Sequence, residues 1–334
     1  MFENTNRIRW IDTAKGLGII IVILGHAYPP DNWLKIIYSF HMPLFFFLSG
    51  YLFSVKKYNS LGKFISNKSR SLLIPYFIFS ILSLIYYATT PLFISNEINW
   101  PKLFVGFFYS NGISGWLDYN VALWFLTCLF VVEIIFYFIL KKITSTKLLV
   151  TVLLVFSIVG YLDSIYMPIR LPWSIDIAFS AIVFFGLGYI SKTVGLINSV
   201  LNQKVKLLVI TLPIFLLFIN QMIKDNYIID MNNNRLNDYY NFYTPAICGI
   251  LLTIIFASLL KSNFIEYLGK NSLVILATHL PIIFFVSIFY NEIGYAMDDR
   301  VLRSLSVTFL AMLVLLPIIY FINRYTPFIL GKKQ

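Results

Sequence analysis

Ten long apolar stretches constrain this chain more than any other feature of its sequence. A helix that crosses a bilayer needs about 20 mostly apolar residues. Ten segments approach that length: 11–30, 33–54, 71–90, 120–140, 147–163, 173–192, 205–223, 240–260, 271–290 and 304–323. Charged residues make up only 12% of the 334 residues, about half their share in a soluble domain. The sequence therefore predicts an all-α integral membrane protein with about ten transmembrane helices, in one domain covering residues 1–334.

The distribution of basic residues predicts the orientation of these spans. If the N-terminus is cytoplasmic, the cytoplasmic segments hold 19 of the 26 Lys and Arg residues and only three acidic residues. The outer segments then hold the other seven basic residues and ten acidic residues. Cytoplasmic loops are enriched in Lys and Arg, so both termini are expected in the cytoplasm. The net charge of +11 then reflects topology, so we expect membrane lipids as partners and no nucleic acid. Cys128 and Cys248 lie in apolar runs, which is typical of small core residues.

All three histidines fall within predicted spans, where ionisable groups are costly and usually functional. In the first span, Asp12, Lys15 and His26 share one helix face. Lys15 and His26 are separated by about 16 Å of helical rise. This stripe, a cation at the cytoplasmic mouth and an imidazole deep in the membrane, suits coenzyme A, which has a phosphorylated head and a long arm ending in a thioester. The alternative is an interfacial Asp12–Lys15 pair, with a histidine satisfied by a neighbouring carbonyl.

The second and third spans carry further candidates. His41 precedes Pro43, which is expected to break the second helix, and Ser49 follows at a depth closer to the cytoplasm. Lys68 and Arg70 at the start of the third span are either positive-inside anchors or phosphate ligands that join Lys15.

The later spans add four residues of interest. Trp124 fits an aromatic belt at the outer interface. Glu133 and Asp176 lie within spans, and we expect each to pair with a histidine or a hydroxyl. His279 is either a second polar group of the same site or a structural hydrogen bonder.

Taken in order, these residues resemble the acyltransferase-3 family of multi-pass membrane proteins, in particular its fucose-4-O-acetylase-like and polysaccharide-adhesin acyltransferase branch. The motifs are Asp12-x-x-Lys15 followed after ten residues by His26, FHMPLFFFLSGY at 40–51, RSLLIPY at 70–76, LWFL at 123–126, and the late His279. Two features differ from the family pattern. The family often has arginine where Lys15 stands, and often two arginines three apart where Lys68 and Arg70 stand two apart.

The resemblance implies a ten-helix bundle in the plasma (inner) membrane. It would move an acyl group, usually acetyl, from acyl-CoA to a hydroxyl of a cell-envelope glycan or lipid-linked sugar. We assign the candidate residues as follows: His26 (general base) and Asp12 to catalysis; Lys15, Lys68, Arg70 and Ser49 to acetyl-CoA or another acyl-CoA; His41, Trp124 and His279 to the acceptor. No metal is expected, because the three histidines lack local ligand spacing and no HExxH motif occurs.

Two alternatives stay open. The polar spans could line the path of a non-enzymatic exporter of a glycan or lipid-linked sugar, although no internal repeat is visible. A ligand-binding sensor or scaffold would also fit the composition. CoA-dependent acyl transfer distinguishes the enzyme from both. Within the enzyme hypothesis, direct transfer and a covalent acyl-histidine or acyl-serine intermediate remain alternatives.

Overall fold

A computed structural model describes residues 8–90, 98–113, 115–292 and 299–332. Across these ranges the secondary structure is helical apart from one antiparallel bridge between Asp230 and Arg235. Eight of the described helical segments are long and apolar enough to cross a membrane. The prediction of an all-α membrane protein is therefore confirmed.

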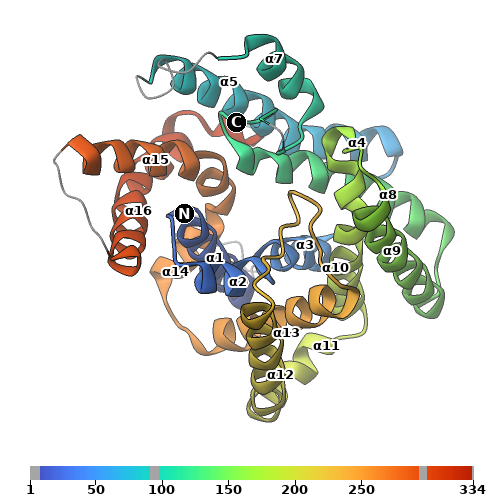
Figure 1. Cartoon of the computed structure of the whole chain (residues 1–334). Coiled ribbons are helices and arrows are strands. Elements are labelled where there is room, and N and C mark those ends of the chain that lie inside the picture. The colour runs from blue at the N-terminus through green and yellow to red at the C-terminus, as the bar shows by residue number, and fades with distance from the viewer. Residues whose placement is uncertain (1–7, 91–97, 114, 293–298, 333–334) are drawn as a thin grey trace.

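The longer helices are α1 (Arg9–His26), α3 (His41–Leu52), α5 (Ile74–Thr89), α7 (Trp100–Tyr109), α8 (Trp124–Lys142), α9 (Thr146–Tyr166), α10 (Ile175–Thr193), α12 (Lys204–Lys224), α13 (Tyr239–Leu259), α15 (Ser272–Glu292) and α16 (Arg300–Tyr325). The shorter elements are α2 (Asp31–Tyr38), η1 (Val55–Lys57), α4 (Leu61–Lys68), η2 (Ser69–Leu73), η3 (Val121–Leu123), η4 (Pro172–Ser174), α11 (Leu196–Asn202), α14 (Asn263–Lys270) and η5 (Pro327–Leu330). In Figure 1, α1 and α3 lie near the middle, with the other long helices arranged around them.

The eight apolar segments correspond to the third through tenth predicted spans. The first two predicted spans differ from expectation. Helix α1 has 18 residues, about 27 Å of rise, and carries Arg9, Asp12 and Lys15 in its first two turns. The second span is not a continuous helix, because it divides into α2 and α3 at Ser39 and Phe40.

Pro43 therefore does not kink a continuous helix as we expected. It stands in the first turn of α3, two residues after His41. The first amides of a helix have no intrahelical partner, so proline is tolerated there. The break falls instead just before His41, and its position places that imidazole at the start of a new helix.

Glycines allow the central helices to approach closely. A Cβ at Gly188 of α10 would lie 2.0 Å from the carbonyl oxygen of Phe47, and one at Gly50 of α3 would lie 1.8 Å from that of Phe185. Helix α14 approaches α1 in the same way, since a Cβ at Gly269 would lie 1.8 Å from the Asp12 carbonyl oxygen. These contacts follow the rule that small residues let helix backbones meet in membranes.

Replacing Gly188 with alanine is expected to destabilise the protein by about 1–3 kcal/mol, because the added methyl group forces α10 away from α3. The measurement is thermal unfolding of the purified protein in detergent. Gly62→Ala in α4 is the matched control, because no atom lies within 4 Å of its Cβ position. Equal melting temperatures for the two variants would contradict this account of the α3–α10 packing.

The two ends of the described chain lie at the same end of the bundle. Gly269 of α14 contacts the start of α1 at Asp12, and Gly331 contacts the Arg70 backbone. Lys332 Nζ donates to Asn323 Oδ1 at 2.7 Å, and Asn323 Nδ2 donates to Asn271 Oδ1, just after α14, at 2.7 Å. This agrees with an even number of crossings, whereas the cytoplasmic location of that end stays a prediction.

Candidate functional site

A cavity of about 240 Å³ lies at the other end of α1, beside His26. Its walls come from the last turns of α1, the α2–α3 junction, the start of α8 and the segment between α12 and α13. The lining residues are Val22, His26, Tyr38, His41, Met42, Gly112, Val121, Ala122, Trp124, Asp230, Met231, Asn232, Asn233 and Leu276.

The three histidines converge at this cavity from three helices. The ring centroids of His26 and His279 are 5.2 Å apart, and Tyr38 lies 6.4 Å from His26 and 4.9 Å from His41. His41 is 5% exposed and His279 is fully buried. His26 and His41 line the cavity, whereas His279 stands directly behind His26. The structure thus brings together residues that are as far apart as 253 positions in the sequence.

Backbone carbonyls select the tautomers of two of these rings. His41 Nδ1 lies 2.8 Å from the Ile37 carbonyl oxygen, and His279 Nδ1 lies 2.8 Å from that of Leu276. A carbonyl oxygen only accepts, so in each ring Nδ1 carries the proton and Nε2 keeps its lone pair. His279 Nε2 is buried and has no hydrogen-bond partner among the described residues. Both rings therefore present a basic nitrogen on the side away from their own helix backbone.

Trp124 is part of the cavity wall and is only 4% exposed. The interpretation of this residue as part of an outer aromatic belt is therefore wrong. Asn120 fixes the local geometry, because its side-chain amide donates to the Ala277 carbonyl oxygen at 2.8 Å and to Ser83 Oγ at 2.9 Å. The first bond holds the start of α8, which carries Trp124, against the part of α15 that carries His279, and the second ties it to α5.

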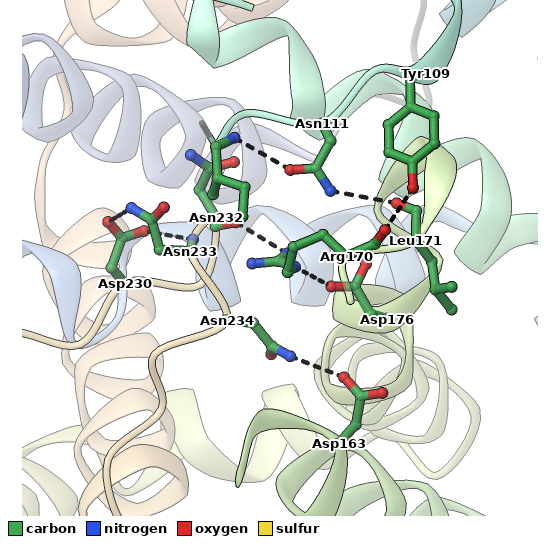
Figure 2. A network of polar contacts seen from close by, with 11 residues as sticks. Tyr109, Asn111, Asp163, Arg170, Leu171, Asp176, Asp230, Asn232, Asn233 and Asn234 are labelled. Carbon is green, nitrogen blue, oxygen red and sulfur yellow. Dashed lines mark hydrogen bonds and ion pairs between the residues drawn. The ribbon is translucent and has the colours of Figure 1, made fainter. Parts of the chain in front are cut away.

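Sequence reasoning missed the polar wall of the cavity. Asp230, Asn232 and Asn233 come from the segment between α12 and α13, and Tyr38 comes from the end of α2. The available signal was the run of three consecutive asparagines at 232–234 beside Asp230, since loops often carry binding residues. Figure 2 shows this segment held in place by polar contacts from several parts of the chain.

A buried ion pair anchors that segment. Arg170 Nε donates to the carboxylate of Asp176, which is 1% exposed, and Arg170 Nη2 donates to the Asn232 carbonyl oxygen at 3.1 Å. We expected Asp176 to pair with a histidine or a hydroxyl, but its partner is an arginine six residues earlier. The ion pair therefore supports the cavity wall from outside the cavity.

The predicted donor residues lie away from the histidines, and so does Asp12, which we assigned to catalysis. Asp12 and His26 are separated by 14 residues of α1, about 21 Å of rise, so Asp12 does not join the imidazole cluster. Lys15 lies at the same end of α1 as Asp12. Ser49 is part-buried in α3 and is not among the described residues that line the cavity.

Lys68 forms an ion pair within the protein. Its Nζ donates to Glu133 Oε1 at 2.7 Å and stands 5.4 Å from the centre of the Phe53 ring. The Lys68 side chain is 17% exposed and that of Glu133 is 6% exposed. The expected partner of Glu133, a histidine or a hydroxyl, is thus replaced by a lysine.

Arg70 lies in η2, a π-helical turn between α4 and α5. Its backbone contacts Gly331, whose neighbour Lys332 borders a second cavity of about 550 Å³. That cavity is lined by Tyr267, Lys270, Asn271, Tyr320, Asn323, Arg324 and Lys332. Three cations therefore surround an open space at the end of the bundle where α1 begins. None of its described lining residues carries a carboxylate.

Comparison with known proteins decides the family. A family model described as an acyltransferase domain matches residues 8–324. The chain belongs to the acyltransferase-3 family. Nodulation protein NolL of Sinorhizobium fredii (strain NBRC 101917 / NGR234) is 34% identical over 137 residues, which cover 36% of this chain and 33% of NolL. The match thus spans about a third of this relative, and no solved structure matches the chain.

Family membership confirms the resemblance drawn from the ordered motifs. The family match extends from the start of α1 almost to the end of α16, so it includes all three histidines and both cavities except Lys332. It does not assign a role to any of these residues. The multi-pass membrane character of the chain, with eight long apolar helices among its described residues, agrees with the family.

Proposed function

We propose that this protein is a membrane O-acyltransferase that moves an acyl group, acetyl in the simplest case, from acyl-CoA to a hydroxyl of a cell-envelope carbohydrate. We place it in the plasma (inner) membrane. The observation that carries the proposal is a cavity lined by His26 and His41, with the ring of His279 next to that of His26, in a chain of the acyltransferase-3 family. No described feature favours an exporter over this reaction.

His26 is the general base of the proposed reaction. Its imidazole takes the proton of the acceptor hydroxyl while that oxygen attacks the thioester carbonyl. The carbon–sulfur bond then breaks, and the protonated imidazole returns the proton to the departing CoA thiolate. Such general-base assistance contributes about 10²–10⁴-fold to a rate.

His279 is the positioning partner of His26. Its Nε2 carries a lone pair, is buried, and belongs to a ring 5.2 Å from that of His26. Accepting a hydrogen bond from one His26 nitrogen would leave the other nitrogen free to act as the base, which is the logic of a base oriented by a third group. None of the described residues lining the cavity is Ser, Thr or Cys. This composition favours direct transfer over an acyl-serine intermediate.

The donor enters from the opposite end of α1 in this proposal. Lys15 and Arg70, together with the basic cavity formed by Lys270, Arg324 and Lys332, would hold the phosphates of CoA. The rise of about 16 Å between Lys15 and His26 is then bridged by the pantetheine arm. We expect Lys68 to contribute less to donor binding than the sequence suggested, because its ammonium group is already paired with the Glu133 carboxylate.

The test of the function is transfer of label. Purified full-length protein is incubated with acetyl-CoA labelled in the acetyl group and with a crude envelope-glycan extract. We expect label in an alkali-labile glycan ester. The absence of both label transfer and CoA binding would contradict the proposal and favour the exporter.

Replacing Arg324 with alanine is expected to raise the KM for acetyl-CoA about tenfold, the effect of losing one charge-assisted hydrogen bond worth about 1.5 kcal/mol. The turnover rate at saturating donor should change little, because Arg324 is remote from His26. Steady-state kinetics with varied donor measure both parameters. Lys56→Ala, which removes an exposed cation from the predicted cytoplasmic face, is the control. An unchanged donor KM for Arg324→Ala would exclude the basic cavity from donor binding.

A further inference from the structure

The segment between α12 and α13 contains a small hairpin, closed by the bridge between Asp230 and Arg235, that forms the polar wall of the histidine cavity. Asp230 and Arg235 exchange two backbone hydrogen bonds, each 2.9 Å long. Within the hairpin, the Asp230 carboxylate accepts from the Asn233 backbone amide at 3.1 Å and from Asn233 Nδ2 at 2.6 Å. A carboxylate offers about four lone-pair sites, so these two bonds orient Asp230 and leave both oxygens able to accept more.

The hairpin is tied to the rest of the protein by several polar contacts. Arg170 holds the Asn232 carbonyl oxygen, and Asn234 Nδ2 donates to Asp163 Oδ2 of α9 at 2.8 Å. Asn232 Nδ2 donates to the Gly112 carbonyl oxygen at 3.3 Å. Figure 2 shows the contacts of Arg170 with Asn232 and of Asn234 with Asp163. A site that is held in place before binding loses less entropy when its ligand arrives.

The cavity has the chemical character of a site for one uncharged sugar ring. Its described lining contains one carboxylate, that of Asp230, and no Lys or Arg. The nearby guanidinium of Arg170 is already paired with Asp176. Tyr38 and Trp124 supply aromatic surface, and Asp230 and Asn233 supply hydrogen-bonding groups. The volume of about 240 Å³ is below the roughly 300–1,000 Å³ of pockets for drug-sized ligands, which favours one ring over a longer chain.

We propose that this hairpin is the acceptor-recognition element, in which Asp230 and Asn233 hydrogen-bond neighbouring hydroxyls of an uncharged sugar ring and thereby present a further hydroxyl to His26. The inference rests on the proposed function and specifies its acceptor. A ring bearing a carboxylate would face Asp230 with no cation in the described wall to offset the repulsion. Uronates are therefore poor acceptors, and neutral hexosides are good ones.

The first experiment measures transfer from acetyl-CoA to a neutral methyl hexoside series and to the corresponding methyl uronosides, using the full-length protein. The variants are Asp230→Asn and Asn233→Ala, with Asp225→Asn as a control that changes an exposed carboxylate just outside the hairpin. We expect at least about a tenfold rise in acceptor KM for Asp230→Asn, the loss of one charge-assisted bond. In the control Asp225→Asn, the acceptor KM, the donor KM and the hydrolysis of acetyl-CoA by water should all stay within about twofold of the unchanged protein.

The second experiment is titration calorimetry of the same glycosides without any acyl donor. Neutral glycosides should bind more tightly than uronosides, and Asp230→Asn should weaken the binding of neutral glycosides. Unchanged binding and unchanged acceptor KM in Asp230→Asn, or a preference for uronosides, would overturn the inference. Because this experiment needs no turnover, binding without acyl transfer would count against the proposed function and not against sugar recognition.

Discussion

Replacing His26 with alanine is expected to lower the rate of acyl transfer about 10²- to 10⁴-fold while leaving acetyl-CoA binding intact. The physical reason is that His26 is the imidazole at the end of α1 that both lines the cavity and contacts the ring of His279. The basic residues assigned to the donor phosphates lie at the other end of that helix, so they are untouched by the substitution. The measurements are single-turnover transfer of labelled acetyl groups and equilibrium binding of CoA.

The other two histidines provide matched comparisons for His26. His279→Gln removes the imidazole behind the base, so we expect a smaller fall in turnover than for His26→Ala, with both KM values preserved. His41→Ala removes an imidazole from the cavity wall, and we expect its main effect on the acceptor KM. Wild-type activity in His26→Ala, or a larger loss in His41→Ala than in His26→Ala, would show that the base is misassigned.

Replacing Lys68 with methionine is expected to destabilise the protein by about 3–5 kcal/mol, because it leaves the Glu133 carboxylate buried without its cation. The Glu133 side chain is only 6% exposed, and its second oxygen has no hydrogen-bond partner among the described residues. The Lys68 ammonium also lies near the Phe53 ring, and the methionine retains most of that packing. Thermal unfolding in detergent measures the change.

The double variant Lys68→Met/Glu133→Gln separates structural from donor-binding roles of Lys68. Removing both charges should recover most of the lost stability, because no unpaired ion remains. If Lys68 is structural, the stable double variant keeps a nearly unchanged donor KM. A donor KM raised as much as in Arg324→Ala would instead show that Lys68 belongs to the donor site. Equal instability of the single and double variants would show that loss of the buried ion pair is not the cause of the instability.

Much of this molecule could be predicted from sequence because a bilayer restricts the backbone so strongly. A chain in hydrocarbon must satisfy its amides within each helix, so apolar length alone predicted ten spans, and eight of them correspond to long apolar helices among the described residues. The cost of an ionisable group in that environment also made His26, His41 and His279 stand out. His26 and His41 line one cavity, and the ring of His279 lies next to that of His26.

Only the tertiary structure decided which of these groups meet. The residues next to Lys68 in the sequence do not reveal that Glu133, 65 positions later, is its partner. The residues next to Asp230 likewise do not reveal that it lines the same cavity as His41. The helix break before His41 likewise depends on packing, because Pro43 by itself indicated a kink two residues further on. Hydropathy and spacing depend on neighbours along one helix, whereas ion pairs and cavity walls depend on side chains from helices distant in sequence. The sequence by itself thus determined the all-α membrane character and the candidate imidazoles, and the packing of the helices decided that these imidazoles lie together beside a cavity with a polar hairpin as one wall.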